Sequence, residues 1–170
     1  MITRLSAAEV DACAEDLAAV LVDAVAGGAS VGFLAPLSLD DAVAWSRALV
    51  PDVADGSVLV WVARTDGKIS GTVQLRLTAA PTGAHRAEVA KLTVLRSARG
   101  HGYGRRLLAA AEDGSASFGV TLLMLDTQTG SAAEGLYSSG GWTRVGTVPE
   151  YAADPAGELR PTTFYYKKVA

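Results

Sequence analysis

A glycine-rich segment between two predicted elements is the part of the chain best suited to chemistry. It follows a predicted strand, opens a predicted helix and reads Arg99, Gly100, His101, Gly102, Tyr103, Gly104, Arg105, Arg106. The first N–H groups of a helix lack partners and carry partial positive charge, so they attract phosphate. Glycines let the backbone approach a ligand closely, and the arginines add local positive charge. The segment therefore predicts a pyrophosphate-binding loop.

Other phosphate-binding loops differ from this one in spacing. The glycines run G-x-G-x-G, whereas a dinucleotide-binding fold has G-x-G-x-x-G near its first strand. No Gly-Lys-Ser or Gly-Lys-Thr triplet follows, which excludes a Walker-type loop. The alternative interpretation is a glycine-rich turn with solvated arginines. The strand–loop–helix context favours phosphate binding over that alternative.

Length, composition and charge narrow the class of protein. The 170 residues suffice for one domain with a sizeable core, so we expect a single domain over residues 1–170. Hydrophobic residues make up 49% of the chain and charged residues 19%, which argues against disorder. The net charge of −3 supplies no general basic field, so we expect no nucleic-acid partner.

Cysteine and histidine give no sign of covalent or metal chemistry. Cys13, the sole cysteine, lies in an alanine-rich stretch where a core thiol is a simpler interpretation than a nucleophile. Two isolated histidines, His85 and His101, predict no metal site. The N-terminus lacks a signal-peptide pattern and no apolar run reaches membrane-spanning length. We therefore expect a cytoplasmic protein without membrane association.

Caps, turns and hydrophobic patterns predict the elements that must position the loop. Ser6 with Glu9 forms a capping-box pattern, Ser38 is a predicted N-cap, and Asp66-Gly67 predicts a tight turn between strands. Helices are expected at 6–25, 39–49, 104–117 and 131–139, and strands at 57–64, 69–77, 87–94, 120–126, 142–148 and 163–169. This order predicts an α/β (α+β) fold, a mixed sheet with helices packed on it.

Two segments resemble the signatures of a known family. The run Arg99-x-x-Gly102-x-Gly104 resembles the R/Q-x-x-G-x-G/A signature of GNAT N-acetyltransferases. Tyr137, followed by Gly141-Trp142, resembles the second signature of the same family. The resemblance implies a GNAT fold with a mostly antiparallel sheet flanked by helices. It also implies acetyl-CoA as cosubstrate, with its pyrophosphate bound by the glycine loop.

Several shorter segments resemble one toxin-resistance enzyme of that family, which acetylates a β-lactam amino acid. These segments are 27–33, 86–89, 91–92, 125–127, 130–131 and, more weakly, 143–146. The resemblance implies a small amine as acceptor, such as an amino-acid-like toxin or antibiotic, and a monomer or homodimer. Two other functions stay open: a non-catalytic acyl-CoA-binding or sensing domain, and acetylation of a protein or peptide N-terminus.

Three side chains are candidates for the chemical step. Asp126 ends a predicted buried strand, where α/β sheets commonly hold ligands, and Glu88 lies in the strand before the glycine loop. A carboxylate is a suitable proton acceptor because alkyl amines are mostly protonated at neutral pH. The resemblance implies that Glu88 and Asp126 hold the amine and accept its proton, and that Tyr137 protonates the coenzyme A thiolate.

Each of these side chains also has a structural alternative. Glu88 could pair with Arg86 on the same strand face, and Asp126 could cap a turn with the threonines that follow it. Tyr137 could be an ordinary core aromatic. Finding the three together favours an enzyme over a sensing domain.

The remaining predicted contacts with the cofactor come from the resemblance. They are backbone groups of the strand that contains Leu92 and Val94, together with Ser131 and the loop residues named above. Two positions depart from the family pattern. Arg96 stands where many members have Pro, and Gly130 stands where many have Asn.

Overall fold

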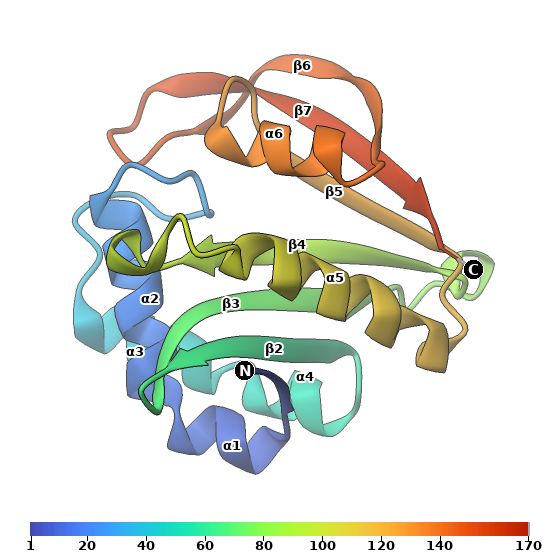
Figure 1. Cartoon of the computed structure of the whole chain (residues 1–170). Helices are drawn as coiled ribbons and strands as arrows, with labels where there is room; N and C mark the ends of the chain where they lie inside the picture. Colours follow the sequence, from blue (N-terminus) through green and yellow to red (C-terminus); the bar gives the residue numbers. More distant parts are fainter. Residues whose placement is uncertain (170) are drawn as a thin grey trace.

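A seven-stranded sheet organises the computed structural model, which describes residues 1–169 (Figure 1). The strands are β1 (Ile2–Leu5), β2 (Val58–Thr65), β3 (Lys68–Leu77), β4 (Arg86–Val94), β5 (Leu122–Gln128), β6 (Thr143–Ala153) and β7 (Leu159–Lys168). They lie in the order β1-β2-β3-β4-β5-β7-β6. Every neighbouring pair is antiparallel except β4 and β5, which are parallel. The predicted mixed, mostly antiparallel sheet is confirmed.

Helices cover both faces of the sheet. They are α1 (Ala7–Ala12), α2 (Ala14–Ala26), α3 (Leu39–Arg47), α4 (Val50–Ala54), α5 (Tyr103–Ser115) and α6 (Ala132–Ser139). Val10 and Leu17 of α1 and α2 pack against Val60 of β2, in the core on one face. Leu107 of α5 packs with Leu123 of β5 on the opposite face, in the same core as α6. We call these the α2 face and the α5 face.

Local signals predicted the starts of several elements correctly. Ser6 and Glu9 form the expected capping box, and Ser38 accepts the expected hydrogen bond from the N–H of Asp41. Asp66 and Gly67 both have positive φ and join β2 to β3, as an Asp-Gly hairpin turn requires.

Several elements differ from the prediction, among them α4 and a shift of β5 to Leu122–Gln128 from the predicted 120–126. The first helix breaks at Cys13 into α1 and α2, although alanine favours helix on both sides, so tertiary packing sets the break. A strand, β1, precedes it and pairs with β2 from Ile2↔Ala63 to Leu5↔Val60. The last two strands are longer than predicted, because β6 and β7 extend to a hairpin turn between Ala153 and Leu159.

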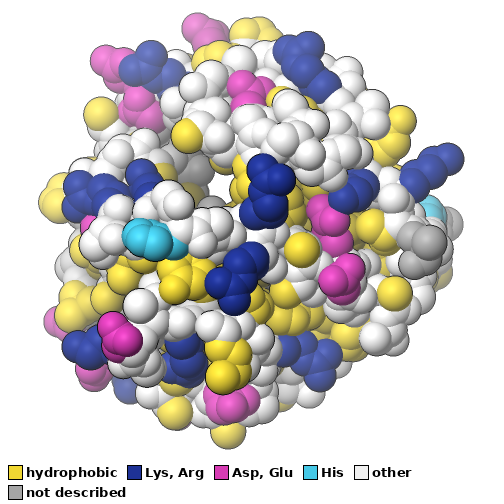
Figure 2. All heavy atoms as spheres, viewed as in Figure 1, with side chains coloured by type: hydrophobic (Ala, Val, Ile, Leu, Met, Phe, Trp, Pro, Cys, Tyr) yellow, Lys and Arg dark blue, Asp and Glu magenta, His cyan; other side chains and the backbone are white. Residues whose placement is uncertain are grey.

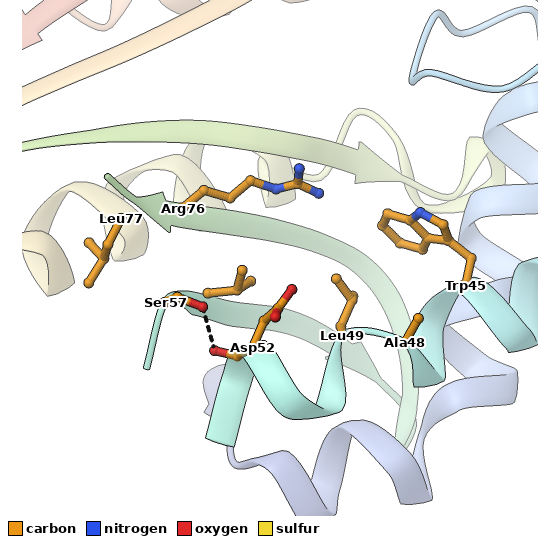
Figure 3. A pocket seen from close by; sticks show the side chains of 8 residues that line it. Trp45, Ala48, Leu49, Asp52, Ser57, Arg76 and Leu77 are labelled. Carbon is orange, nitrogen blue, oxygen red and sulfur yellow. Dashed lines mark hydrogen bonds between the residues drawn. The ribbon is translucent and has the colours of Figure 1, made fainter. Parts of the chain in front are cut away.

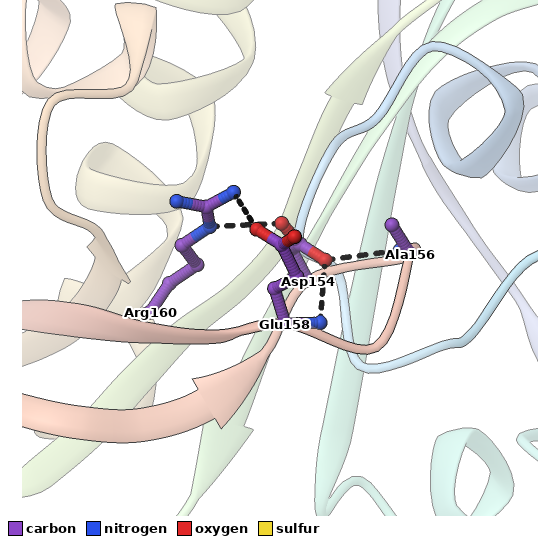
Figure 4. Close-up of polar contacts among 4 residues, drawn as sticks. All are labelled: Asp154, Ala156, Glu158 and Arg160. Atoms are coloured by element: carbon purple, nitrogen blue, oxygen red, sulfur yellow. Dashed lines mark hydrogen bonds and ion pairs between the residues drawn. The ribbon is translucent and has the colours of Figure 1, made fainter.

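This hairpin turn is held by Asp154. One carboxylate oxygen accepts the N–H groups of Ala156 and Glu158, both at 3.0 Å, and the other accepts Nε of Arg160 at 2.9 Å (Figure 4). The turn also contacts the loop between α2 and α3, since the N–H of Ala35 donates to the carbonyl of Pro155 at 2.8 Å. The hairpin and that loop are therefore in direct contact.

The sheet opens between its two parallel strands. β4 and β5 pair only at their first residues, from Arg86↔Leu122 to Glu88↔Met124. Beyond that point each strand remains paired with its outer neighbour, and the two diverge towards their carboxyl ends (Figure 1). The glycine loop and the start of α5 follow the end of β4. The opening therefore lies beside the predicted phosphate loop.

Candidate functional site

The two predicted carboxylates lie on the same face of the sheet. Glu88 is opposite Met124 in the register, and Asp126 follows Met124 by two residues. Side chains two apart on a strand share a face, so Glu88 and Asp126 both lie on the α2 face. Arg76 of β3 is opposite Glu88 and also belongs to this face. The site thus contains two carboxylates and a guanidinium where β4 and β5 begin to diverge.

Asp126 has an environment that favours proton uptake. Part of its side chain reaches solvent, but the surrounding protein removes enough hydration to raise its pKa. The positive charge of Lys91 opposes this effect without cancelling it. A carboxylate with a raised pKa is a stronger base than one in water, which suits acceptance of a proton from an amine.

Lys91 is a site residue that the sequence analysis missed. It lies in a bulge of β4, where Lys91 and Leu92 stand between Ala90↔Gln74 and Thr93↔Thr72, and its φ is +53°. Its Nζ donates to the carbonyl of Val31 at 2.6 Å. The available signal was a second cation in this strand, next to Leu92 and close to the predicted glycine loop.

The rings around Lys91 limit its contact with water. Nζ lies 5.7 Å from the ring centroid of Phe33 and 5.9 Å from that of Trp45, within cation–π range. Burial lowers the pKa of Lys91, and the positive charge of Arg76 lowers it further, while Glu88 and Asp126 raise it. Lys91 therefore interacts with both predicted carboxylates and with Arg76.

Tyr137 belongs to the opposite, α5 face. It lies on α6, is 5% exposed, and packs against Trp142 and Tyr165 at centroid distances of 6.0 and 5.8 Å. Burial, followed by the charges of Asp126 and Tyr165, raises its pKa to about 12. Its hydroxyl has no hydrogen-bond partner within residues 1–169. The phenol is neutral and its proton is available to a ligand.

The glycine loop has the geometry of an anion site. Gly102 is the N-cap of α5 with φ +75°, a conformation that residues with a Cβ rarely adopt, and no side chain caps the helix. The first N–H groups of α5 are therefore free to bind a ligand. Lys and Arg side chains gather at the edge of a hollow between the layers of α5 and α6 (Figure 2). A helix start and nearby cations together favour a pyrophosphate.

The loop side chains differ in what they contact. His101 Nδ1 lies 3.0 Å from the carbonyl oxygen of Arg99, and the Tyr103 hydroxyl accepts a hydrogen bond from Thr65 at 2.8 Å. These two side chains hold the loop itself. Arg99 Nε donates to the carbonyl of Val94 at 3.3 Å, and Arg105 donates to the Ser139 hydroxyl at 3.3 Å. Arg105 therefore links α5 to α6 across the opening.

The other predicted cofactor contacts lie along the rim of the opening. Leu92 and Val94 belong to the part of β4 that has no β5 partner. Ser131 is the N-cap of α6, and its hydroxyl lies 3.1 Å from that of Thr127. Gln128, at the end of β5, was not predicted. Its Oε1 is buried with no hydrogen-bond partner in the described chain, so a donor on a ligand would satisfy it.

Both positions that depart from the family pattern have defined contacts in the structure. The Arg96 N–H donates to one oxygen of Asp23 at 2.8 Å and its Nε to the other at 2.9 Å. Proline lacks that N–H, so Arg96 ties the segment before the glycine loop to α2 in a way proline does not. Gly130 has φ +80° and donates its N–H to Glu134 at 2.7 Å, which shapes the turn into α6.

No group of three or more His, Cys, Asp or Glu side chains within residues 1–169 could hold a metal ion. None of the helices in that part of the chain is both long and apolar enough to cross a membrane.

Taken together, the glycine loop, two carboxylates and a buried tyrosine lie around one opening in the sheet. The glycine loop can bind the phosphates, and groups able to accept or donate a proton lie on the two faces of the sheet opening. Residues 22–141 match the model of the Acetyltransferase (GNAT) family. This match covers most of the chain, which therefore belongs to the GNAT acetyltransferases.

Solved structures show the same fold at low identity. A ribosomal-protein-alanine N-acetyltransferase from Brucella melitensis is 24% identical, with TM-score 0.77 and 99% of each chain covered. The protein yncA from Salmonella typhimurium, solved with its cofactor acetyl-CoA, is 20% identical, with TM-score 0.78 and coverage of 100% and 94%. An aminoglycoside 6'-acetyltransferase type Ii is 17% identical, with TM-score 0.73 and coverage of 100% and 97%.

Proposed function

We propose that this protein transfers the acetyl group of acetyl-CoA to the amine of a small molecule. The observation that carries the proposal is the arrangement of acid and base around the sheet opening. Asp126, with a raised pKa, belongs to the α2 face, and the neutral phenol of Tyr137 approaches from the α5 face. A donor thioester between them has a proton acceptor on one side and a proton donor on the other.

Each step of the proposed reaction has a residue suited to it. The glycine loop binds the pyrophosphate, and the unpaired edge of β4 near Leu92 offers backbone N–H groups to the thioester carbonyl. The amine nitrogen attacks that carbonyl while Asp126, directly or through water, accepts the proton that the amine loses. The carbon–sulfur bond then breaks, and Tyr137 donates its proton to the departing thiolate. Glu88 holds the cationic amine before it is deprotonated.

The acceptor in this proposal is small and amino-acid-like. Short segments of the chain resemble the tabtoxin resistance protein, an acetyltransferase that acts on a β-lactam amino acid. The solved aminoglycoside acetyltransferase, itself an enzyme of drug modification, supports small-molecule chemistry on this fold. Cationic groups on the acceptor are favoured by the carboxylates of Glu88 and Asp126. Resistance to a toxin or antibiotic is the corresponding biological role.

The experiment is a thiol-release assay with acetyl-CoA and a panel of amino acids, polyamines, aminoglycosides and β-lactam amino acids. A peptide with N-terminal alanine is included because the Brucella protein acetylates ribosomal protein. We expect release with one class of small amine and none with the peptide. Acetylation of the peptide and of no small amine would contradict a small-molecule acceptor and indicate a protein substrate. Acetyl-CoA binding without any turnover would support a sensing domain instead.

A further inference from the structure

A pocket on the α2 face has a charged group that the proposed chemistry does not use. Its volume is about 400 Å³, and it lies between α3–α4 and the paired ends of β2 and β3 (Figure 3). Trp45, Leu49 and Val58 supply apolar walls, and Asp52 and Arg76 supply a carboxylate and a guanidinium. The volume accommodates part of a small organic molecule.

Arg76 is the cation of this pocket, and its guanidinium makes hydrogen bonds only to Gln74 among the described residues. It is half-buried, and its Nε and one Nη donate to Gln74 Oε1 at 3.3 and 3.1 Å. No carboxylate within the described residues 1–169 lies at ion-pair distance from its guanidinium. A guanidinium has five N–H donors in a planar fork that matches a carboxylate. A half-buried fork with free donors is suited to binding an anion from solution.

The pocket adjoins the proposed acceptor site. Arg76 is opposite Glu88 on neighbouring strands, so their Cα atoms are about 5 Å apart. Trp45 and Leu49 also line a second, smaller cavity that Lys91 and Gln74 border. Arg76 and Lys91 are close enough for their charges to oppose each other. An anion bound at Arg76 offsets this repulsion between like charges.

We propose that Arg76 binds the carboxylate of the acceptor and thereby selects amino acids over simple amines. The acceptor's amine lies at Glu88 and Asp126, and its carboxylate lies a few bonds away on Arg76. The side chain of the acceptor amino acid extends into the pocket, where the Asp52 carboxylate favours a neutral or cationic group over an acidic one. This inference rests on the proposed acetyl transfer and adds the substrate class.

The test compares each amino acid with its own carboxamide in the thiol-release assay. Wild type should prefer the acid by about 10- to 100-fold in kcat/KM, the range expected for a charge-assisted forked contact. In Arg76→Gln the preference should disappear, mainly through a rise in KM for the acid, with the carboxamide little changed. Arg86→Gln is the matched control, because Arg86 lies on the same face but outside the pocket. It should keep the preference.

A binding measurement makes the test independent of turnover. Trp45 lines the pocket, so titration with amino acids should change its fluorescence saturably in wild type but not in Arg76→Gln. Trp45→Phe identifies the signal, and thermal unfolding shows that each variant is folded. Equal use of acids and carboxamides by wild type overturns the role of Arg76 while leaving acetyl transfer intact. Failure of the wild-type protein to bind acetyl-CoA overturns the proposed function. If the fluorescence change in wild type is absent, or is the same in Arg76→Gln, the carboxylate site is overturned whatever the turnover.

Discussion

Replacing Tyr137 with Phe removes the proposed proton donor to the coenzyme A thiolate and keeps the aromatic ring. A pKa of about 12, against an ordinary value of 10.0, means that ionising this phenol costs roughly 3 kcal/mol more in the folded chain than in water. The hydroxyl is therefore neutral throughout the working pH range. We expect Tyr137→Phe to lower kcat by about 100- to 10,000-fold, the usual contribution of a general acid. The dissociation constant for acetyl-CoA should stay the same.

Stability measurements separate this chemical role from a structural one. The hydroxyl has no hydrogen-bond partner within residues 1–169, so its removal should change the free energy of unfolding by less than about 0.5 kcal/mol at neutral pH. Tyr137 has a raised pKa, so its neutral form stabilises the fold fully below pH 10, and that contribution is lost as pH rises towards 12. The Phe variant should lose less stability over that alkaline window. Wild-type kcat in the folded variant would refute the assignment.

Three further predictions test other parts of the molecule. Asp126→Asn should lower kcat/KM by at least about 100-fold and remove the acidic limb of the pH–rate profile, as stopped assays across pH can show. Arg96→Pro should cost about 1–2 kcal/mol in urea unfolding, because it removes the N–H bond and ion pair to Asp23. Gly114→Ala should lower the melting temperature despite alanine's helix propensity, since its Cβ would clash with the indole ring of Trp61. An unchanged or higher melting temperature contradicts that packing argument.

The pH dependence of the Asp23 contact has a definite sign. Burial tends to raise the pKa of Asp23, but the hydrogen bonds and charge of Arg96 outweigh it and lower the pKa below its ordinary value of 3.8. The ionised carboxylate therefore stabilises the fold above that value, and the contribution is lost as pH falls through the lowered pKa. Wild type should lose more stability than Arg96→Pro in that acidic range.

Much of the fold follows from local patterns in the sequence. Alternating and apolar runs located six strands, and caps such as Ser6 and Ser38 located helix starts, because these signals lie within a few residues of the element. The break at Cys13 and the short strand β1 could not be predicted. β1 pairs with β2, and Cys13 contacts Arg64 of that same strand, which is more than forty residues away in sequence.

The candidate site likewise has parts that local sequence patterns predict and parts that depend on long-range strand pairing. The glycine loop is a contiguous motif, and Asp126 is recognisable at the end of a buried strand. Arg76 and Lys91 could be placed near the carboxylates only from the strand register. The bulge in β4 sets the position of Lys91, and cross-strand pairing makes Arg76 the neighbour of Glu88. A carboxylate-bearing acceptor needed a cationic partner that the sequence alone could not locate.

The most direct measurement combines thiol release with mass spectrometry of the acceptor. We expect one N-acetylated acceptor for each coenzyme A released, with both products lost in Asp126→Asn and Tyr137→Phe while acetyl-CoA still binds. Coenzyme A release without an acetylated amine, or unchanged product formation in both variants, would contradict the proposed acetyl transfer.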